Sequence, residues 1–90
     1  MVRVVGTISD GDRAIIRNVS ITMHETRWPE GGTSWQGDFD LPPSVAPPDP
    51  LRFYRFETSD GRSGQIVVRS VDLVSRQLPH VVFRTTGPFG

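Results

Sequence analysis

The sequence of 90 residues contains no cysteine and no lysine. Without cysteine there is no disulfide bond, no thiolate nucleophile and no thiolate metal site. Without lysine there is no Schiff-base chemistry and no phosphate-binding loop of the P-loop type. All ten basic residues are arginines, and they balance ten acidic residues to a formal net charge of zero. This balance argues against strong non-specific attraction to nucleic acid or to an anionic membrane.

Long apolar runs are also missing. No segment approaches the ~20 apolar residues of a membrane helix, and the first residues show no apolar stretch typical of a secretory signal. We therefore expect a soluble, cytoplasmic protein. Valine, isoleucine, threonine and aromatic residues are common, while nine glycines and eight prolines interrupt the chain too often for long helices. The composition predicts an all-β fold.

Six strands are expected between turn signals, and an Asp-Gly pair typical of a hairpin separates the first from the second and the fourth from the fifth. In the third strand, Trp35, Phe39 and Leu41 share one face and polar residues share the other. In the second and fifth strands the apolar pattern changes face partway, which predicts a β-bulge or a bend in each. The expected strands are residues 2–8, 14–24, 34–41, 51–58, 65–75 and 80–87.

The two halves of the chain resemble each other around the second and fifth strands. Residues 15–21 read IIRNVSI and residues 67–73 read VVRSVDL, and each follows a Ser-Asp-Gly turn. A structural repeat and a chance similarity of β sequences both explain this. If each half is a three-stranded meander, neither can bury its apolar face alone. The sequence therefore predicts one domain over residues 1–90, a small six-stranded antiparallel barrel built from two meanders, with a two-sheet sandwich as the alternative.

Five of the eight prolines fall within the segment Leu41–Pro50, LPPSVAPPDP. Proline cannot donate to a sheet ladder, so this run ends the third strand. Its bias toward polyproline II makes a stiff, extended chain of about 3.1 Å per residue. We interpret residues 42–50 as an internal connection that crosses the end of the barrel rather than as a linker between domains.

The predicted function is a non-enzymatic binding or assembly module without a cofactor. Trp28 and Pro29 lie in a loop rich in glycine and proline, where no pattern requires the tryptophan to be buried. An exposed tryptophan is a common anchor for a partner, although Trp28 folding back to cap the barrel is an alternative. Pro47 and Pro48, with Tyr54, complete the expected contact surface for a protein partner. A homo-oligomer formed through an exposed strand edge is a further expectation.

The first alternative is a single-stranded nucleic-acid-binding barrel. The stretch LRFYRF interleaves arginine with aromatic residues, the chemistry of phosphate contact and base stacking. The candidate residues are Arg52, Tyr54 and Arg55. Alternation must bury either Leu51 with Phe53 or Tyr54 with Phe56, so only some of these aromatic side chains can face solvent.

The second alternative is a carboxylate-based metal site or enzyme. Asp38 and Asp40 lie two apart on one strand, so their carboxylates share a face about 7 Å apart, and His24 or Glu25 could lie near them. The spacing matches no calcium loop, and His24-Glu25 starts a zinc-protease pattern that Trp28 breaks. His24 and His80 are otherwise expected to be ordinary strand residues. We therefore assign no metal ligand and no catalytic residue from the sequence.

Overall fold

A computed structural model of the chain describes residues 2–27, 29, 31, 33–43, 45–72 and 78–87. These residues form six antiparallel strands and contain no helix. It follows that no helix capable of crossing a membrane occurs in this described part. The strands are β1 (Val2–Asp10), β2 (Arg13–Arg27), β3 (Thr33–Asp40), β4 (Phe53–Thr58), β5 (Ser63–Asp72) and β6 (His80–Thr85).

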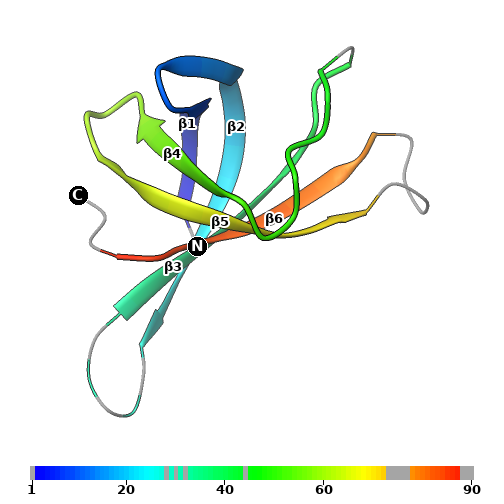
Figure 1. The fold of residues 1–90 in the computed structure, drawn as a ribbon. Helices are drawn as coiled ribbons and strands as arrows, with labels where there is room; N and C mark the ends of the chain where they lie inside the picture. Colours follow the sequence, from blue (N-terminus) through cyan, green and yellow to red (C-terminus); the bar gives the residue numbers. More distant parts are fainter. Residues whose placement is uncertain are drawn as a thin grey trace.

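The strands close into a barrel in the order β1-β2-β3-β6-β5-β4, with β4 pairing back to β1 (Figure 1). Strands β1 to β3 form one antiparallel meander, and β4 to β6 form the other. The two meanders meet at β3 with β6 and at β1 with β4. Because β4 returns to lie beside β1, the connection from β3 to β4 is a Greek-key crossing. The predicted six-stranded barrel of two meanders is confirmed, and the sandwich alternative is excluded.

The hairpins and bulges arise where the sequence signals them. Gly11 and Gly61 have φ values of 62° and 93°, in the left-handed region that the Asp-Gly turns require. Strand β2 contains an extra residue between Ile16 and Val19 relative to β1, and β5 contains an extra residue at Arg69 relative to β6. Both predicted bulges are therefore confirmed, and they begin at matching arginines, Arg17 and Arg69, of the two similar segments.

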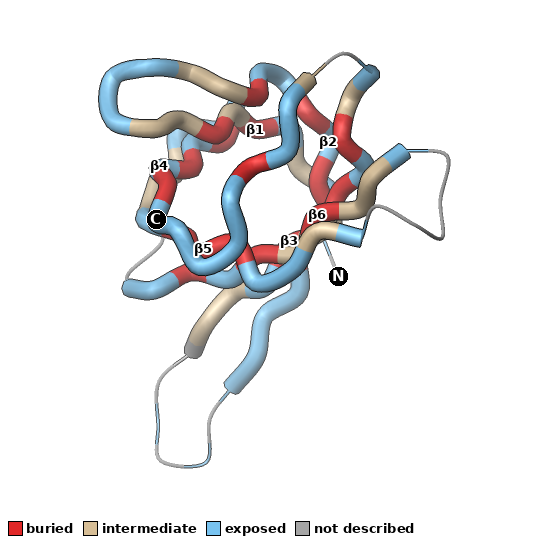
Figure 2. The backbone as a smooth tube through the Cα atoms, turned by 45° about the vertical axis from the view of Figure 1, so that its right-hand side comes forward, coloured by how far each residue is buried: buried red, intermediate tan, exposed pale blue. Residues whose placement is uncertain are grey.

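The barrel interior is filled by alternate residues of all six strands, which form a ring of buried positions in Figure 2. In β4 the interior side chains are Tyr54 and Phe56, so Phe53 faces outward. Trp35 is partly buried against this core, in line with the alternation of β3. The core consists of Ile8, Ile16, Val19, Ile21, Met23, Phe39, Leu41, Tyr54, Phe56, Ile66, Val68, Val81 and Phe83.

Two glycines create the space for the largest of these side chains. A Cβ at Gly37 would overlap the ring of Phe83, and a Cβ at Gly6 would overlap the ring of Phe56. The two rings contact each other at 5.3 Å between centroids. A six-stranded barrel has a narrow interior, and these two rings fit because each lies over a strand position without a side chain.

The β2–β3 hairpin extends beyond the barrel, as Figure 1 shows at its lower end. The last pair between β1 and β2 is Val2 with Met23, so β2 from His24 to Arg27 pairs only with β3 among the described residues. Within the described part of the chain, two other edges also lack a partner strand, at residues 2–4 of β1 on the side of β4 and at residues 33–35 of β3 on the side of β6. Contact between copies through an exposed strand edge therefore remains a prediction.

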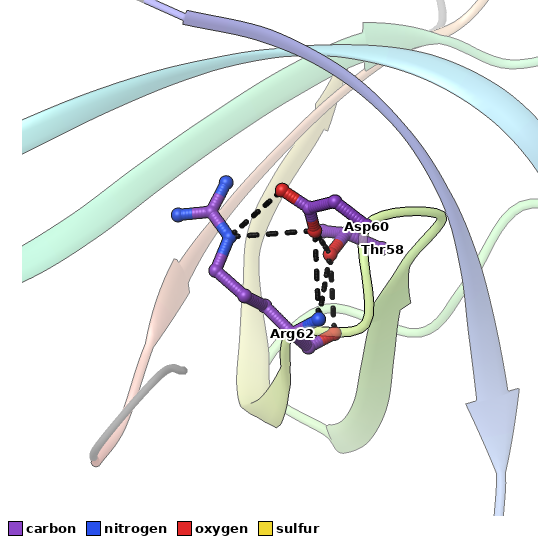
Figure 3. A network of polar contacts seen from close by, with 3 residues as sticks. All are labelled: Thr58, Asp60 and Arg62. Carbon is purple, nitrogen blue, oxygen red and sulfur yellow. Dashed lines mark hydrogen bonds and ion pairs between the residues drawn. The ribbon is translucent and has the colours of Figure 1, made fainter.

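The barrel end near the β4–β5 turn is fixed by a polar network (Figure 3). The Asp60 carboxylate accepts hydrogen bonds from the Thr58 hydroxyl and from the Arg62 amide, and it pairs with the Arg62 guanidinium at 3.2 Å. Arg62 also lies 5.9 Å from the centre of the Trp35 ring. The hydrogen bond from Thr58, aided by Arg62, lowers the pKa of Asp60 below its usual value.

We expect this network to make stability depend on acid pH. Because the folded-state pKa of Asp60 is lowered, its stabilising contribution is present above about pH 4 and is lost as the pH falls through the folded-state pKa. The variant Asp60→Asn should unfold at lower urea than the native protein near neutral pH. The difference in midpoint between the two should shrink below about pH 4.

Urea titrations followed by circular dichroism at several pH values measure this difference. Asp12→Asn is the matched control, because Asp12 flanks the other Asp-Gly turn and makes no ion pair within the described part of the chain. A difference for Asp60→Asn that stays constant with pH would contradict the network.

Candidate binding groove

A groove of about 400 Å³ lies between the β1–β2 hairpin and the β3–β4 connection. Figure 2 shows this connection running across one end of the ring of strands. We call the hollow the proline groove. One wall is formed by Asp10 and by Arg13–Ile15 of the hairpin. The other wall is Val45–Asp49, and Arg52 and Tyr54 of the β4 start close the base.

The wall made by the connection is held to the barrel by apolar and polar contacts. Val45 packs against the core, and Pro48 is buried. The amide of Asp49 donates a hydrogen bond to the Tyr54 hydroxyl at 2.8 Å. Ala46 and Pro47, by contrast, are exposed on the groove. The wall is therefore anchored at both ends and presents small apolar side chains to solvent between them.

Charge at the base of the groove is largely balanced. The Arg52 guanidinium pairs with Asp10 at 2.7 Å and with Asp49 at 3.5 Å, and it lies 5.9 Å from the centre of the Tyr54 ring. The Asp10 carboxylate raises the pKa of Arg52 above its already high usual value. Arg13, at the rim, is exposed and makes no ion pair with any described residue. The groove thus combines small apolar side chains with a paired set of charges and with one guanidinium, that of Arg13, that has no described carboxylate partner.

The connection ends in a tight turn with an unusual residue. Arg52 donates its amide to the carbonyl of Asp49 at 3.4 Å, Pro50 follows Asp49, and Leu51 has a φ of 64°. This is the pattern of a type II turn, whose third position favours glycine. The Leu51 amide then bonds to Val68 at 2.7 Å and starts the pairing of β4 with β5. The turn sets the direction in which β4 enters the barrel.

We expect Leu51→Gly to raise the free energy of unfolding by about 0.5 to 1 kcal/mol. A left-handed residue with a Cβ costs about 1 to 2 kcal/mol, and the extra backbone entropy of glycine in the unfolded chain offsets part of this gain. Leu51 is 78% exposed, so little packing is lost. Leu51→Ala keeps the Cβ and should give no gain. Thermal and urea unfolding of both variants test this, and equal stability of the two variants would contradict the strain.

The structure gathers some of the predicted contact residues and separates others. Pro47, Pro48 and Tyr54 all line the proline groove, although Tyr54 is only 5% exposed. Pro29 is exposed in the β2–β3 connection. This connection follows the end of β2, whereas the groove residues Arg13–Ile15 lie at the start of that strand. Trp28 lies outside the described residues. The hairpin wall from Asp10 to Ile15 was not anticipated, because only closure of the barrel brings it beside the connection.

The residues suggested for nucleic-acid binding are occupied by other contacts. The ring of Tyr54 belongs to the core, and its hydroxyl accepts the Asp49 amide. Arg52 pairs with Asp10, and Arg55 pairs with Glu57 at 2.9 Å. The set Arg52, Tyr54 and Arg55 therefore presents neither a free aromatic face nor an unpaired guanidinium.

Asp38 and Asp40 meet a partner that the sequence interpretation did not assign to them. His80 of β6 places one ring nitrogen 2.9 Å from Asp40 and the other 2.9 Å from Asp38. His24 and Glu25 lie farther along β2, where His24 pairs with Gln36. No cluster of three potential metal ligands with suitable geometry occurs among the described residues. Since both nitrogens of His80 face carboxylates, the cluster links β3 to β6.

Comparison with protein-family models, with curated proteins and with solved structures finds no match to this chain.

Proposed function

We propose that this protein is a non-enzymatic binding module that holds an extended segment of a partner protein in the proline groove. The observation that carries the proposal is the groove itself, whose small apolar wall of Val45, Ala46 and Pro47 faces Ala14 and Ile15 of the hairpin. The groove combines these apolar side chains with the charged groups of Asp10, Arg13, Asp49 and Arg52. Concave sites that combine apolar contacts with a few placed polar groups are typical of ligand binding.

The charges of the groove suggest the chemistry of the bound segment. Arg52 is paired with Asp10 and Asp49, so it contributes little net charge. Arg13 at the rim has no described carboxylate partner, and a guanidinium suits a planar carboxylate. The proposed ligand is therefore a short apolar stretch that ends in, or is followed by, a carboxylate.

A binding role agrees better with the polar clusters than catalysis does. A general base needs one ring nitrogen directed at a substrate. In His80 both nitrogens contact carboxylates of β3 at 2.9 Å. The cluster thus has the geometry of a cross-link between strands, and the groove contains no histidine.

The test is an NMR titration of ¹⁵N-labelled protein with acetyl-Leu-Pro-Val-Leu carrying either a free or an amidated C-terminus. We expect shifts confined to amides of the hairpin and connection walls, with the free acid binding about 2- to 5-fold more tightly, the size expected for an exposed ion pair. No shift at the groove with either peptide at millimolar concentration would contradict the proposal.

Two variants separate the apolar and the charged contributions. Ala46→Phe should fill the groove and abolish the shifts from both peptides, because Ala46 is exposed on its wall. Arg13→Gln should remove only the preference for the free acid. Arg3→Gln, an exposed arginine of β1 outside the groove, is the control and should leave both affinities unchanged.

A further inference from the structure

A second surface lies on the outside of the barrel, independent of the proline groove. Register places Phe53, Val67, Arg84 and Gln36 in one row across β4, β5, β6 and β3. Residues directly opposite on neighbouring strands share a face and lie about 5 Å apart. This row therefore forms a strip on the outer face, in which Phe53, Arg84 and Gln36 are exposed and Val67 is buried between Phe53 and Arg84.

The strip exposes an aromatic ring that the core does not need. Phe53 is 56% exposed, whereas Val67 beside it is 8% exposed. Leu51, two residues before Phe53, is 78% exposed and adopts the left-handed backbone described above. A strained and exposed leucine beside an exposed phenylalanine costs stability, and such costs often mark a functional surface.

Two arginines without a described carboxylate partner lie on the neighbouring strands β5 and β6. Arg84 lies in the same row, and Arg69 occupies the bulge of β5 two residues after Val67. Both are exposed, and neither pairs with a carboxylate in the part of the chain that the structure describes. Other arginines, such as Arg52 and Arg55, are paired. Asp72 of β5, and Asp38 and Asp40 of β3, lie toward the other end of β6 beside His80. The positive charge is therefore confined to the part of the face that carries Arg69 and Arg84.

A hollow of about 360 Å³ adjoins the strip on its other side. It is lined by Tyr54 and Arg55 of β4 and by Ser63–Gln65 of β5. Arg55 pairs in register with Gln65, two positions along the strands from the pair Phe53–Val67 and on the same face. Polar side chains next to an exposed ring provide hydrogen-bonding groups beside a stacking surface.

We propose that this face binds single-stranded nucleic acid, with Phe53 stacking on a base and with Arg69 and Arg84 contacting phosphates. An unpaired base offers the flat face that an exposed ring requires, and strand-binding barrels combine stacking with phosphate contacts. A duplex keeps its bases stacked and would leave Phe53 without a partner. With only two open guanidiniums, binding is weak and moderately sensitive to salt.

The test is fluorescence anisotropy of a fluorescein-labelled oligothymidylate of about 12 nucleotides, titrated with protein from about 25 to 200 mM salt. Two phosphate contacts on a single strand predict a slope of about −1.4 for the logarithm of the binding constant against the logarithm of salt concentration. Phe53→Ala should weaken binding about 5- to 100-fold. Arg84→Gln should reduce the slope to about −0.7.

Arg17→Gln is the matched control. Arg17 sits at the bulge of β2 that corresponds to Arg69, is exposed, and has no aromatic residue among its β1 neighbours. It removes the same charge and should leave the slope unchanged. Circular dichroism and urea titration verify that each variant folds.

Three results would overturn the proposal. The first is no binding at the lowest salt, and the second is an effect of Arg17→Gln equal to that of Arg84→Gln. The third is tight binding of a polyglutamate peptide without binding of the oligonucleotide, which would assign the face to an acidic protein partner. Loss of peptide binding at the proline groove has no bearing on these results, because Phe53, Arg69 and Arg84 do not line that groove, although Tyr54 borders both hollows.

Discussion

Truncating Phe83 to alanine is expected to lower the free energy of unfolding by about 3 to 5 kcal/mol. The ring is fully buried and contacts Phe56 at 5.3 Å and Phe39 at 6.2 Å between centroids. Its loss would leave a cavity between the two meanders, since Phe83 lies on β6 where that strand meets β3. Domains of this size are stabilised by about 5 to 15 kcal/mol in total, so the variant approaches the limit of folding.

Phe83 and Gly37 are opposite each other on β6 and β3, so a double variant of the two residues can test whether the Phe83 ring fills the space above Gly37. A Cβ at Gly37 would overlap the Phe83 ring and lie 2.8 Å from Met23 Sδ, so Gly37→Ala should cost about 1 to 3 kcal/mol through overpacking. In the double variant with Phe83→Leu, the smaller side chain leaves room for the new methyl group. The double variant should therefore be more stable than the sum of the two single effects predicts.

Urea unfolding of the two single variants and the double variant measures this coupling. Gly11→Ala is not a suitable control, because Gly11 has a positive φ of 62°. Ser20→Ala, at an exposed position of β2, serves instead and should change stability by less than about 0.5 kcal/mol. Strict additivity of Gly37→Ala and Phe83→Leu would show that the ring does not occupy the space above Gly37.

Substitution of Tyr54 is expected to cause the second large loss of stability, and this residue belongs both to the core and to the proline groove. Tyr54→Ala should cost about 3 to 5 kcal/mol, since the ring is 5% exposed and packs in the core. Tyr54→Phe keeps the ring and removes the acceptor of the Asp49 amide, which should cost about 1 kcal/mol.

Hydrogen exchange distinguishes the two roles of Tyr54. In Tyr54→Phe the Asp49 amide should exchange about 5-fold faster, because about 1 kcal/mol of local protection is lost. Amides of β2 and β3 should keep their native exchange rates. If the Asp49 amide exchanges at the native rate in this variant, the hydroxyl does not hold the groove wall.

Local sequence signals predicted the strands, because each of these signals depends only on residues that are neighbours in the chain. Alternation in β3 identified Phe39 and Leu41 as interior, and the Asp-Gly pairs identified two hairpins. The change of face in β2 and β5 identified the bulges, since an extra residue shifts the alternation by one position. These features need no knowledge of the rest of the fold.

The sequence did not decide which side chains of β4 face the interior, because local alternation is the only signal that it offers there. LRFYRF has apolar residues at both parities, so alternation alone allows either Phe53 or Tyr54 and Phe56 to face inward. Pairing of β4 with both β1 and β5 selects Tyr54 and Phe56. That choice exposes Phe53 and moves the stacking chemistry away from the residues that the sequence had suggested.

The sequence by itself determined that the chain forms one all-β domain of two meanders, because periodicity, turn residues and the lack of a self-sufficient half are properties of composition and local order. It left open whether the meanders close into a barrel or stack as a sandwich, and the structure shows the barrel. Only the tertiary structure decided which side chains meet. Asp10 reaches Arg52, His80 reaches Asp38 and Asp40, and Arg84 aligns with Phe53 across Val67. These pairs are far apart in the chain, and their proximity depends on barrel closure and strand register, which no local pattern specifies.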